Sequence, residues 1–267
     1  MQALSNSYPV WFCDIWGVVH NGVAPFVATT DVLQMHRENG GRVVLVTNAP
    51  RTAADVEKQL AEIGVNRACW DDVVTSGDVT RDLMVRHSGG KLYHIGPGRD
   101  LSLFEGLDVK RVAVEDAGAI ICTGLFREES EQPEAYSDFF IAQIACGLPM
   151  ICANPDKIVR KGDKLLPCAG ALAEIYSKLG GRVLMAGKPY APIYDLAVSK
   201  CGGVDKTHIL AIGDGPETDV KGAADYGLPV VLIAGGVNES GDDLETEVKR
   251  LVPQARILKT LFDLTWI

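Results

Sequence analysis

Short apolar runs alternate with longer amphipathic stretches along almost the whole chain. The first run is Val10–Ile15 and the last clear one is Pro229–Ile233. Apolar runs of strand length between amphipathic segments predict a parallel sheet whose strands are joined by helices. The predicted strands are Val10–Ile15, Arg42–Val46, Val73–Val74, Lys91–Ile95, Arg111–Val114, Ala119–Thr123, Pro149–Ala153, Arg182–Met185, His208–Ile212 and Pro229–Ile233.

The segments between these runs carry the spacing and the stop signals of helices. Gly40 and Gly64 each follow an amphipathic stretch, at the position where glycine commonly ends a helix. The pattern therefore predicts an α/β protein with a Rossmann-like core, in which helices flank a parallel sheet. The predicted helices are Thr29–Glu38, Pro50–Ile63, Gly77–His87, a segment near Pro133–Cys146 and a segment from Leu165 to Leu179.

The middle of the chain differs in character from its two ends. The segments rich in chemically reactive side chains lie on both sides of residues 79–183, and there is no internal repeat or low-complexity linker. This arrangement favours an insertion over two domains in tandem. We therefore expect a discontinuous core domain, residues 1–78 and 184–267, and an inserted α/β domain, residues 79–183.

Composition and charge narrow the functional classes. The chain has 267 residues, of which 47% are hydrophobic, and a net charge of −9. Such a charge leaves no basic excess for a nucleic-acid partner. The apolar runs fall short of the ~20 residues that a membrane helix needs, and the N-terminus lacks the pattern of a signal peptide. Seven cysteines without CxxC spacing indicate reduced thiols. We expect a soluble, cytoplasmic protein without a membrane partner.

Polar clusters stand where several predicted strands end. In an open parallel sheet, ligands bind in the crevice beyond the carboxyl ends of the strands, so these side chains should meet. A carboxylate can attack phosphorus, a lysine and a hydroxyl can hold phosphate oxygens, and further carboxylates can hold Mg²⁺. The residues in question are Asp14, Thr47, Asn48, Lys188, Asp214 and Asp219.

These clusters carry a family resemblance. The motifs in chain order are D-x-x-G-V (Asp14–Val18), V-T-N (Val46–Asn48), G-K-P (Gly187–Pro189) and G-D-x-x-x-T-D (Gly213–Asp219). Together they resemble the haloacid dehalogenase superfamily, and more narrowly its class IIA (NagD-like) phosphatases. Asn154-Pro155-Asp156 in the insertion supports the same resemblance. One such motif would be weak evidence, whereas four in order span nearly the whole chain.

The resemblance implies a role for each matching position of the core. Asp14 would be the nucleophile and a metal ligand, and the backbone carbonyl of Trp16 would be a second ligand. Thr47 would hydrogen-bond the transferring phosphoryl group, beside the backbone of Asn48. Lys188 would neutralise the charge of the phosphate and of the nucleophile.

The resemblance extends to the remaining acidic residues and to the insertion. Asp214 would bind Mg²⁺ directly, and Asp219 would orient a metal-bound water or Lys188. The insertion would be a cap that closes over the site and supplies substrate contacts, with Asn154 and Asp156 as candidates. The implied function is Mg²⁺-dependent hydrolysis of a phosphomonoester of a small metabolite through an aspartyl-phosphate intermediate. An exposed cap face could support a homo-oligomer.

Two positions depart from the family pattern. Phosphatases of this family usually have an aspartate two residues after the nucleophile, where it protonates the leaving group. This chain has Trp16 there, and indole offers only an N–H donor. Because general acid–base catalysis is worth about 10²–10⁴-fold, we expect slow turnover unless another group substitutes. The second departure is Ala49, where class IIA members often have asparagine.

Several alternatives stay open from the sequence. Trp16 favours a catalytically weakened protein that binds phosphate and metal, and an aromatic residue at that position is also found in 2-haloacid dehalogenases. Thr47-Asn48 could simply cap a helix, and the Gly213–Asp219 segment could be an ordinary turn. Trp16 could be a packing residue, and Asn154 and Asp156 could only fix a turn. The sequence does not identify the substrate.

Overall fold

The chain forms two compact units. The computed structural model describes residues 1–267 except 88, 162–163, 236–243 and 267, and it leaves the side chains of residues 160 and 161 undescribed. Unit 1 comprises residues 1–47, 54–74 and 188–267, and unit 2 comprises residues 48–53 and 75–187. The predicted boundaries of independent domains, after residues 78 and 183, stay a prediction.

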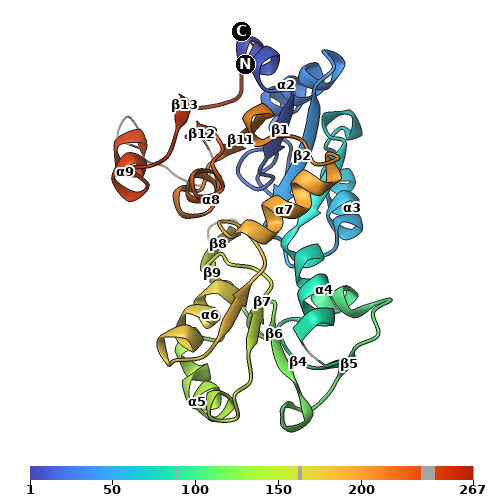
Figure 1. Cartoon of the computed structure of the whole chain (residues 1–267), viewed down its shortest axis with the longest axis vertical. Coiled ribbons are helices and arrows are strands. Elements are labelled where there is room, and N and C mark those ends of the chain that lie inside the picture. The colour runs from blue at the N-terminus through green and yellow to red at the C-terminus, as the bar shows by residue number, and fades with distance from the viewer. Residues whose placement is uncertain (88, 162–163, 236–243, 267) are drawn as a thin grey trace. The chain divides into compact units, whose positions relative to one another are not determined.

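Unit 1 is built on a six-stranded sheet (Figure 1). The strand order is β13-β12-β11-β1-β2-β3, and the pairs from β13 to β2 are parallel. The chain proceeds outward from β1 in one direction and from β11 in the other, so the strand order reverses between these two strands. Ligands bind at such a switch point in open α/β sheets. The strands are β1 (Val10–Cys13), β2 (Arg42–Thr47), β3 (Asp72–Thr75), β11 (Ile209–Gly213), β12 (Val230–Ile233) and β13 (Ile257–Leu261).

Helices on both faces explain why the central strands of unit 1 are continuously apolar. All four residues of β1 are buried, as parallel strands covered on both faces require. Trp11 of β1 stacks on His36 of α2, with ring centroids 3.7 Å apart. Within the described residues, no helix is long and apolar enough to span a membrane. The helices are α1 (Gln2–Ser7), α2 (Val27–Glu38), α3 (Ala53–Ile63), α7 (Ala191–Lys200), α8 (Lys221–Tyr226) and α9 (Leu244–Leu251).

Unit 2 has its own parallel sheet, with the order β10-β7-β6-β4-β5. Alternate residues of β6 point to opposite faces: Ile120 joins the core formed with Phe140 and Tyr176, and Ile121 joins the core formed with Met84. Unit 2 is therefore a three-layer α/β structure. Its elements are β4 (Lys91–Ile95), β5 (Lys110–Arg111), β6 (Ala119–Cys122), β7 (Met150–Cys152), β10 (Val183–Met185), α4 (Ser76–His87), α5 (Ser137–Ala145) and α6 (Ala169–Lys178).

The predicted α/β fold with a parallel sheet flanked by helices is confirmed, and the structure adds that unit 2 also has a parallel sheet. Two local predictions in unit 2 are wrong. The strand predicted over Arg111–Val114 ends at Arg111, because the chain turns into a short 3₁₀ segment, Val114–Asp116. The helix predicted from Leu165 begins only at Ala169. Residues before it form an antiparallel hairpin of β8 (Ile158–Lys161) and β9 (Lys164–Pro167), which the sequence pattern did not predict.

One buried carboxyl group gives unit 2 a testable pH dependence. Asp100 is 1% exposed, and burial raises the pKa of its carboxyl group to about 6. The folded protein therefore holds this proton more tightly than the unfolded chain, so stability falls as pH rises from about 4 to 6. We expect wild type to lose about 2 kcal/mol relative to Asp100→Asn across that window.

Denaturant unfolding at pH 4, 5, 6 and 7 checks this expectation for Asp100. The control is Asp116→Asn, since Asp116 is exposed in the same unit. The free energy of unfolding of this variant should change with pH as that of wild type does. If the free energies of unfolding of wild type and Asp100→Asn differ by the same amount at all four pH values, Asp100 is not the source of the pH dependence.

Candidate metal and phosphate site

Three adjacent strands of unit 1 place polar side chains at the same edge of its sheet. Cys13 pairs with Ile212 of β11 and with Leu45 of β2. Asp14 therefore lies just beyond β1, beside the strand ends that carry Asp214 and Thr47. The backbone N–H of Asp14 donates to the carbonyl of Ile212 at 2.9 Å, which extends the β1–β11 pairing by one residue. This register brings the side chains together at the switch point of the sheet.

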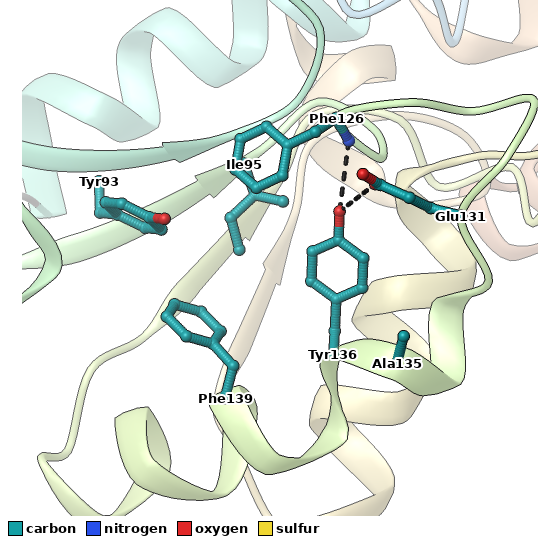
Figure 2. A pocket seen from close by; sticks show the side chains of 7 residues that line it. All are labelled: Tyr93, Ile95, Phe126, Glu131, Ala135, Tyr136 and Phe139. Atoms are coloured by element: carbon teal, nitrogen blue, oxygen red, sulfur yellow. Dashed lines mark hydrogen bonds between the residues drawn. The ribbon is translucent and has the colours of Figure 1, made fainter.

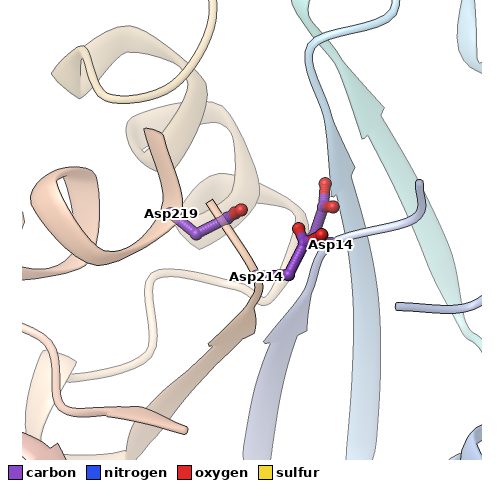
Figure 3. Close-up of side chains that lie close together, drawn as sticks. All are labelled: Asp14, Asp214 and Asp219. Carbon is purple, nitrogen blue, oxygen red and sulfur yellow. The ribbon is translucent and has the colours of Figure 1, made fainter. Parts of the chain in front are cut away.

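Three carboxylates converge there. Asp14, Asp214 and Asp219 are all buried and each offers an oxygen within 4.8 Å of the others. Figure 3 shows Asp14 and Asp214 at neighbouring strand ends, with Asp219 directed toward them from the helical turn after β11. Lys188 is 3% exposed. Its ammonium group donates to Asp14, and to Oδ1 of Asp219 at 2.8 Å. The sequence prediction that these four residues meet agrees with this geometry.

Backbone contacts orient two of the carboxylates. The second oxygen of Asp219 accepts the N–H of Gly215 at 3.1 Å, so Asp219 is held from both sides. Gly17 has a φ of +85°, which favours glycine. A Cβ at Gly17 would overlap with Oδ2 of Asp214. The glycine of the D-x-x-G motif thus serves two purposes, because it adopts the positive φ of the turn that begins there and leaves room for Asp214.

The electrostatic balance follows from burial and from the charge of Lys188. Burial raises the pKa of Asp14 well above its usual range, against the opposing effect of Lys188 and with a further rise from Asp219. Burial alone would lower the pKa of Lys188, but the negative charges of Asp14 and Asp219 outweigh it and raise that pKa. Lys188 is therefore a fixed positive charge between two carboxyl groups.

This donor set fits Mg²⁺. The three carboxylates and Lys188 together carry a formal charge of −2 when all are ionised, which a divalent cation would balance. Mg²⁺ prefers oxygen ligands and usually takes only one or two protein carboxylates. Because both oxygens of Asp219 already accept hydrogen bonds, from Lys188 and from the N–H of Gly215, Asp214 and Asp14 are the residues best suited to hold the ion.

Trp16 packs within its own loop. Its indole meets the ring of His20 edge to face, with centroids 5.3 Å apart, and a Cβ at Gly22 would overlap with it. Trp16 is only half-buried. These contacts favour the packing interpretation of its side chain, and its backbone carbonyl stays a proposed metal ligand.

Three further predicted residues lie in unit 2. Asn48 directly follows Thr47 and is 5% exposed. Its side-chain amide donates to Oδ1 of Asp156 at 2.8 Å, although the two residues are 108 positions apart. Asn154 accepts the backbone N–H of Asp156 at 3.0 Å, which closes a tight turn. The insertion motif therefore has a defined internal role, and direct substrate contact by Asn154 or Asp156 stays a proposal.

Unit 2 also contains an apolar cavity of about 320 Å³ (Figure 2). Three of its lining residues are joined by hydrogen bonds: the hydroxyl of Tyr136 donates to Glu131 at 2.6 Å and accepts the N–H of Phe126 at 3.3 Å. The cavity lining contains no cationic side chain that could bind phosphate. The lining residues are Tyr93, Ile95, Phe126, Glu131, Ala135, Tyr136 and Phe139.

Sequence reasoning overlooked two positions beside the site. One is Gly17, to which the sequence analysis gave no role of its own, and the other is Gly187, where a Cβ would overlap with Oδ1 of Asn48. The signal for both was available, since each glycine belongs to a motif that also carries a charged site residue. The sequence pattern does not show which neighbouring atom leaves no room for a side chain at each of these glycines.

The parallel sheet of unit 1 thus carries a lysine-bridged carboxylate cluster at its switch point. A family model described as haloacid dehalogenase-like hydrolase matches residues 11–110, and one described as HAD-hydrolase-like matches residues 185–264. A crystal structure of a haloacid dehalogenase-like hydrolase from Brucella suis is 44% identical, with a TM-score of 0.88 over 99% of this chain and 98% of that one. The chain belongs to the haloacid dehalogenase-like hydrolase family.

Two more distant proteins resemble the whole chain. NagD from Escherichia coli K-12 is 23% identical and covers 98% of both chains with a TM-score of 0.75, which confirms the NagD-like fold. The D-glycerol 3-phosphate phosphatase of Mycobacterium tuberculosis is 26% identical over 94% of this chain and 69% of that protein. The predicted membership of the haloacid dehalogenase superfamily is thus confirmed.

Proposed function

We propose that this hydrolase is a Mg²⁺-dependent phosphatase that cleaves a phosphomonoester of a small metabolite through an aspartyl-phosphate on Asp14. The observation that carries the proposal is the buried cluster in which Lys188 joins Asp14 and Asp219 while Asp214 lies within ligand distance. Similarity to a protein named as a D-glycerol 3-phosphate phosphatase supports it.

The reaction has two displacements at phosphorus. A carboxylate oxygen of Asp14 forms a bond to phosphorus as the ester P–O bond breaks, and the leaving alkoxide takes a proton to become an alcohol. Water then attacks the same phosphorus, loses a proton, and displaces the Asp14 carboxylate as inorganic phosphate leaves. Splitting one difficult step into two is the benefit of a covalent intermediate.

The other residues of the cluster stabilise charge. Lys188 balances the negative charge of Asp14 and of the phosphoryl oxygens, and its bond to Asp219 at 2.8 Å fixes its position. Thr47, at the end of β2, would donate its hydroxyl to a phosphoryl oxygen. Mg²⁺ held by Asp14 and Asp214, with the carbonyl of Trp16, would lower the repulsion between the anionic nucleophile and its anionic substrate.

The substrate class is a small phosphorylated metabolite, and unit 2 would act as the cap that recognises its non-phosphate part. A panel of phosphomonoesters, including p-nitrophenyl phosphate, glycerol phosphates, sugar phosphates, nucleotides and phosphoglycolate, tests the function with Mg²⁺ and with EDTA. Mg²⁺-dependent phosphate release from one or more of them is expected. Release of halide from 2-haloacids without metal would instead identify a dehalogenase.

Trp16 favours one second candidate, a weakened enzyme that mainly binds its phosphorylated ligand. Replacing Trp16 by aspartate would restore a general acid, which is typically worth about 10²–10⁴-fold in rate. We expect Trp16→Asp to raise kcat at least tenfold, with the inhibition constant of inorganic phosphate unchanged. Trp16→Asn is the control, because it loses the same packing on His20 and Gly22 without gaining an acid.

The pair of Trp16 variants distinguishes the outcomes. A rise in kcat for Trp16→Asp and not for Trp16→Asn would show that the missing acid limits turnover. If neither variant is faster than wild type, a different group already supplies the proton, and the weakened-enzyme candidate is abandoned.

A further inference from the structure

We infer that Asp156 is a positioning residue that holds Asn48, and with it the two chain segments that carry Thr47 and Lys188. This inference rests on the proposed function, because Thr47, Lys188 and the Asn48 backbone are taken there as the groups that bind phosphate. Its evidence lies in the hydrogen bonds and close packing around the Asn48 side chain.

The first contact joins Asn48 to Asp156. The amide Nδ2 of Asn48 donates to Oδ1 of Asp156 at 2.8 Å, and Asn48 is 5% exposed. A hydrogen bond to an ionised acceptor is about twice as strong as a neutral one. The direction of the Asn48 side chain is therefore set by a carboxylate, and the peptide between Thr47 and Asn48 is set with it.

The second contact joins Asn48 to Gly187. A Cβ at Gly187 would overlap with the amide oxygen of Asn48 and approach the ring of Pro155 and the hydroxyl of Ser76 closely. Gly187 thus packs directly on the amide that Asp156 orients. Because Gly187 immediately precedes Lys188 in the chain, this packing fixes where the lysine segment begins.

Asp156 is itself held by its own turn. Its backbone N–H donates to Asn154 at 3.0 Å, and its carbonyl accepts the N–H of Gly170 at 3.1 Å. A Cβ at Gly170 would overlap with the carbonyl of Pro155. The backbone of Asp156 is therefore held on both its N–H and its carbonyl, which fixes the point from which its carboxylate reaches Asn48.

The expected consequence is a loss of phosphate affinity and rate without loss of the fold. An error of about 1 Å in a positioning group can cost about 10²-fold in rate. We expect Asp156→Ala to lower kcat/KM by about 10–100-fold and to raise the inhibition constant of inorganic phosphate. Asp156→Asn should stay close to wild type, because its amide oxygen can still accept from Asn48.

An exchange of the two side chains separates positioning from general damage. Asn48→Asp alone faces one carboxylate with another and should be strongly impaired. Adding Asp156→Asn restores the hydrogen bond in the opposite direction, with the amide at position 156 donating to the carboxylate at position 48. The kcat/KM of the double variant should therefore be at least tenfold higher than that of Asn48→Asp. Damage unrelated to the Asn48–Asp156 hydrogen bond would give no such pair-specific recovery, and phosphate affinity in variants with unchanged melting temperature separates positioning from a loss of stability.

Lys157→Met is the matched control. Lys157 is the next residue in the chain and forms an exposed ion pair with Glu174 at 3.2 Å, so its loss should leave kcat/KM unchanged. Melting temperatures are recorded for every variant, and phosphate binding is also measured by calorimetry. An unchanged phosphate affinity in folded Asp156→Ala, or no recovery in the exchanged pair, would overturn the inference. Wild type without phosphatase activity on the panel would instead reject the proposed function.

Discussion

Replacing Asp14 by asparagine should abolish phosphatase turnover, with kcat falling by about 10⁵-fold or more, as removal of a covalent nucleophile typically does. An amide cannot form the acyl-phosphate that carries the first displacement. The measurement is the release of p-nitrophenol and of inorganic phosphate by purified wild type and variant in Mg²⁺.

The metal-free protein should respond to the same Asp14 substitution in the opposite sense. The neutral amide of the Asp14→Asn variant lowers the excess negative charge of a buried cluster, whose burial already disfavours an ionised Asp14. We therefore expect the variant in EDTA to melt at a temperature no lower than wild type. Asp82→Asn is the control, because Asp82 forms an exposed i,i+4 ion pair with Arg86.

Equal activity in Asp14→Asn and wild type would exclude Asp14 as the nucleophile.

Replacing Lys188 by methionine should strongly destabilise the protein. The ammonium group is the cation that bridges Asp14 and Asp219, and its side chain is 4% exposed. Removing one partner of a buried ionic group leaves uncompensated charge and typically costs about 3–5 kcal/mol. We expect a loss of that size in the free energy of unfolding in EDTA, together with loss of phosphatase activity.

A second substitution tests the cause of the Lys188 effect. Adding Asp219→Asn to Lys188→Met removes one of the orphaned carboxylates, so the double variant should be more stable than Lys188→Met alone. A non-additive result of this kind reports direct coupling between the two side chains. Additive losses, or a Lys188→Met protein as stable as wild type, would contradict this charge balance.

The central strands of the two parallel sheets were predictable because they are buried on both faces. Val10–Cys13 and Ala119–Cys122 are entirely buried, so each is a continuous apolar run bounded by polar residues. The hairpin of β8 and β9 was not predictable in this way. Lys164 and Leu165 of β9 are both exposed. The apolar residues of such a strand show no alternation that separates it from the amphipathic helix that follows.

The last strand of unit 1 was missed for a related reason. β13, with the sequence ILKTL, is only partly buried at the sheet edge and carries an exposed Lys259. Edge strands commonly carry charged residues of this kind. Its pairing with β12 therefore depends on a neighbour in space that the local sequence does not reveal.

The acidic cluster was predictable because strand ends in a parallel sheet converge, whatever their separation in sequence. Asp14, Lys188 and Asp219 were expected together, and their hydrogen bonds now place them so. The bond from Asn48 to Asp156 could not be read from the sequence, since it depends on how a turn in unit 2 is placed around Gly170.

The central claim is that Asp14 becomes phosphorylated, and trapping that species tests it most directly. Wild type mixed with Mg²⁺ and substrate would be quenched in acid within the first turnover, digested, and analysed by mass spectrometry. We expect a phosphoryl group on Asp14 in wild type and none anywhere in Asp14→Asn. Phosphate release without any modified Asp14, or a phosphoryl group on another residue, would contradict the proposed mechanism.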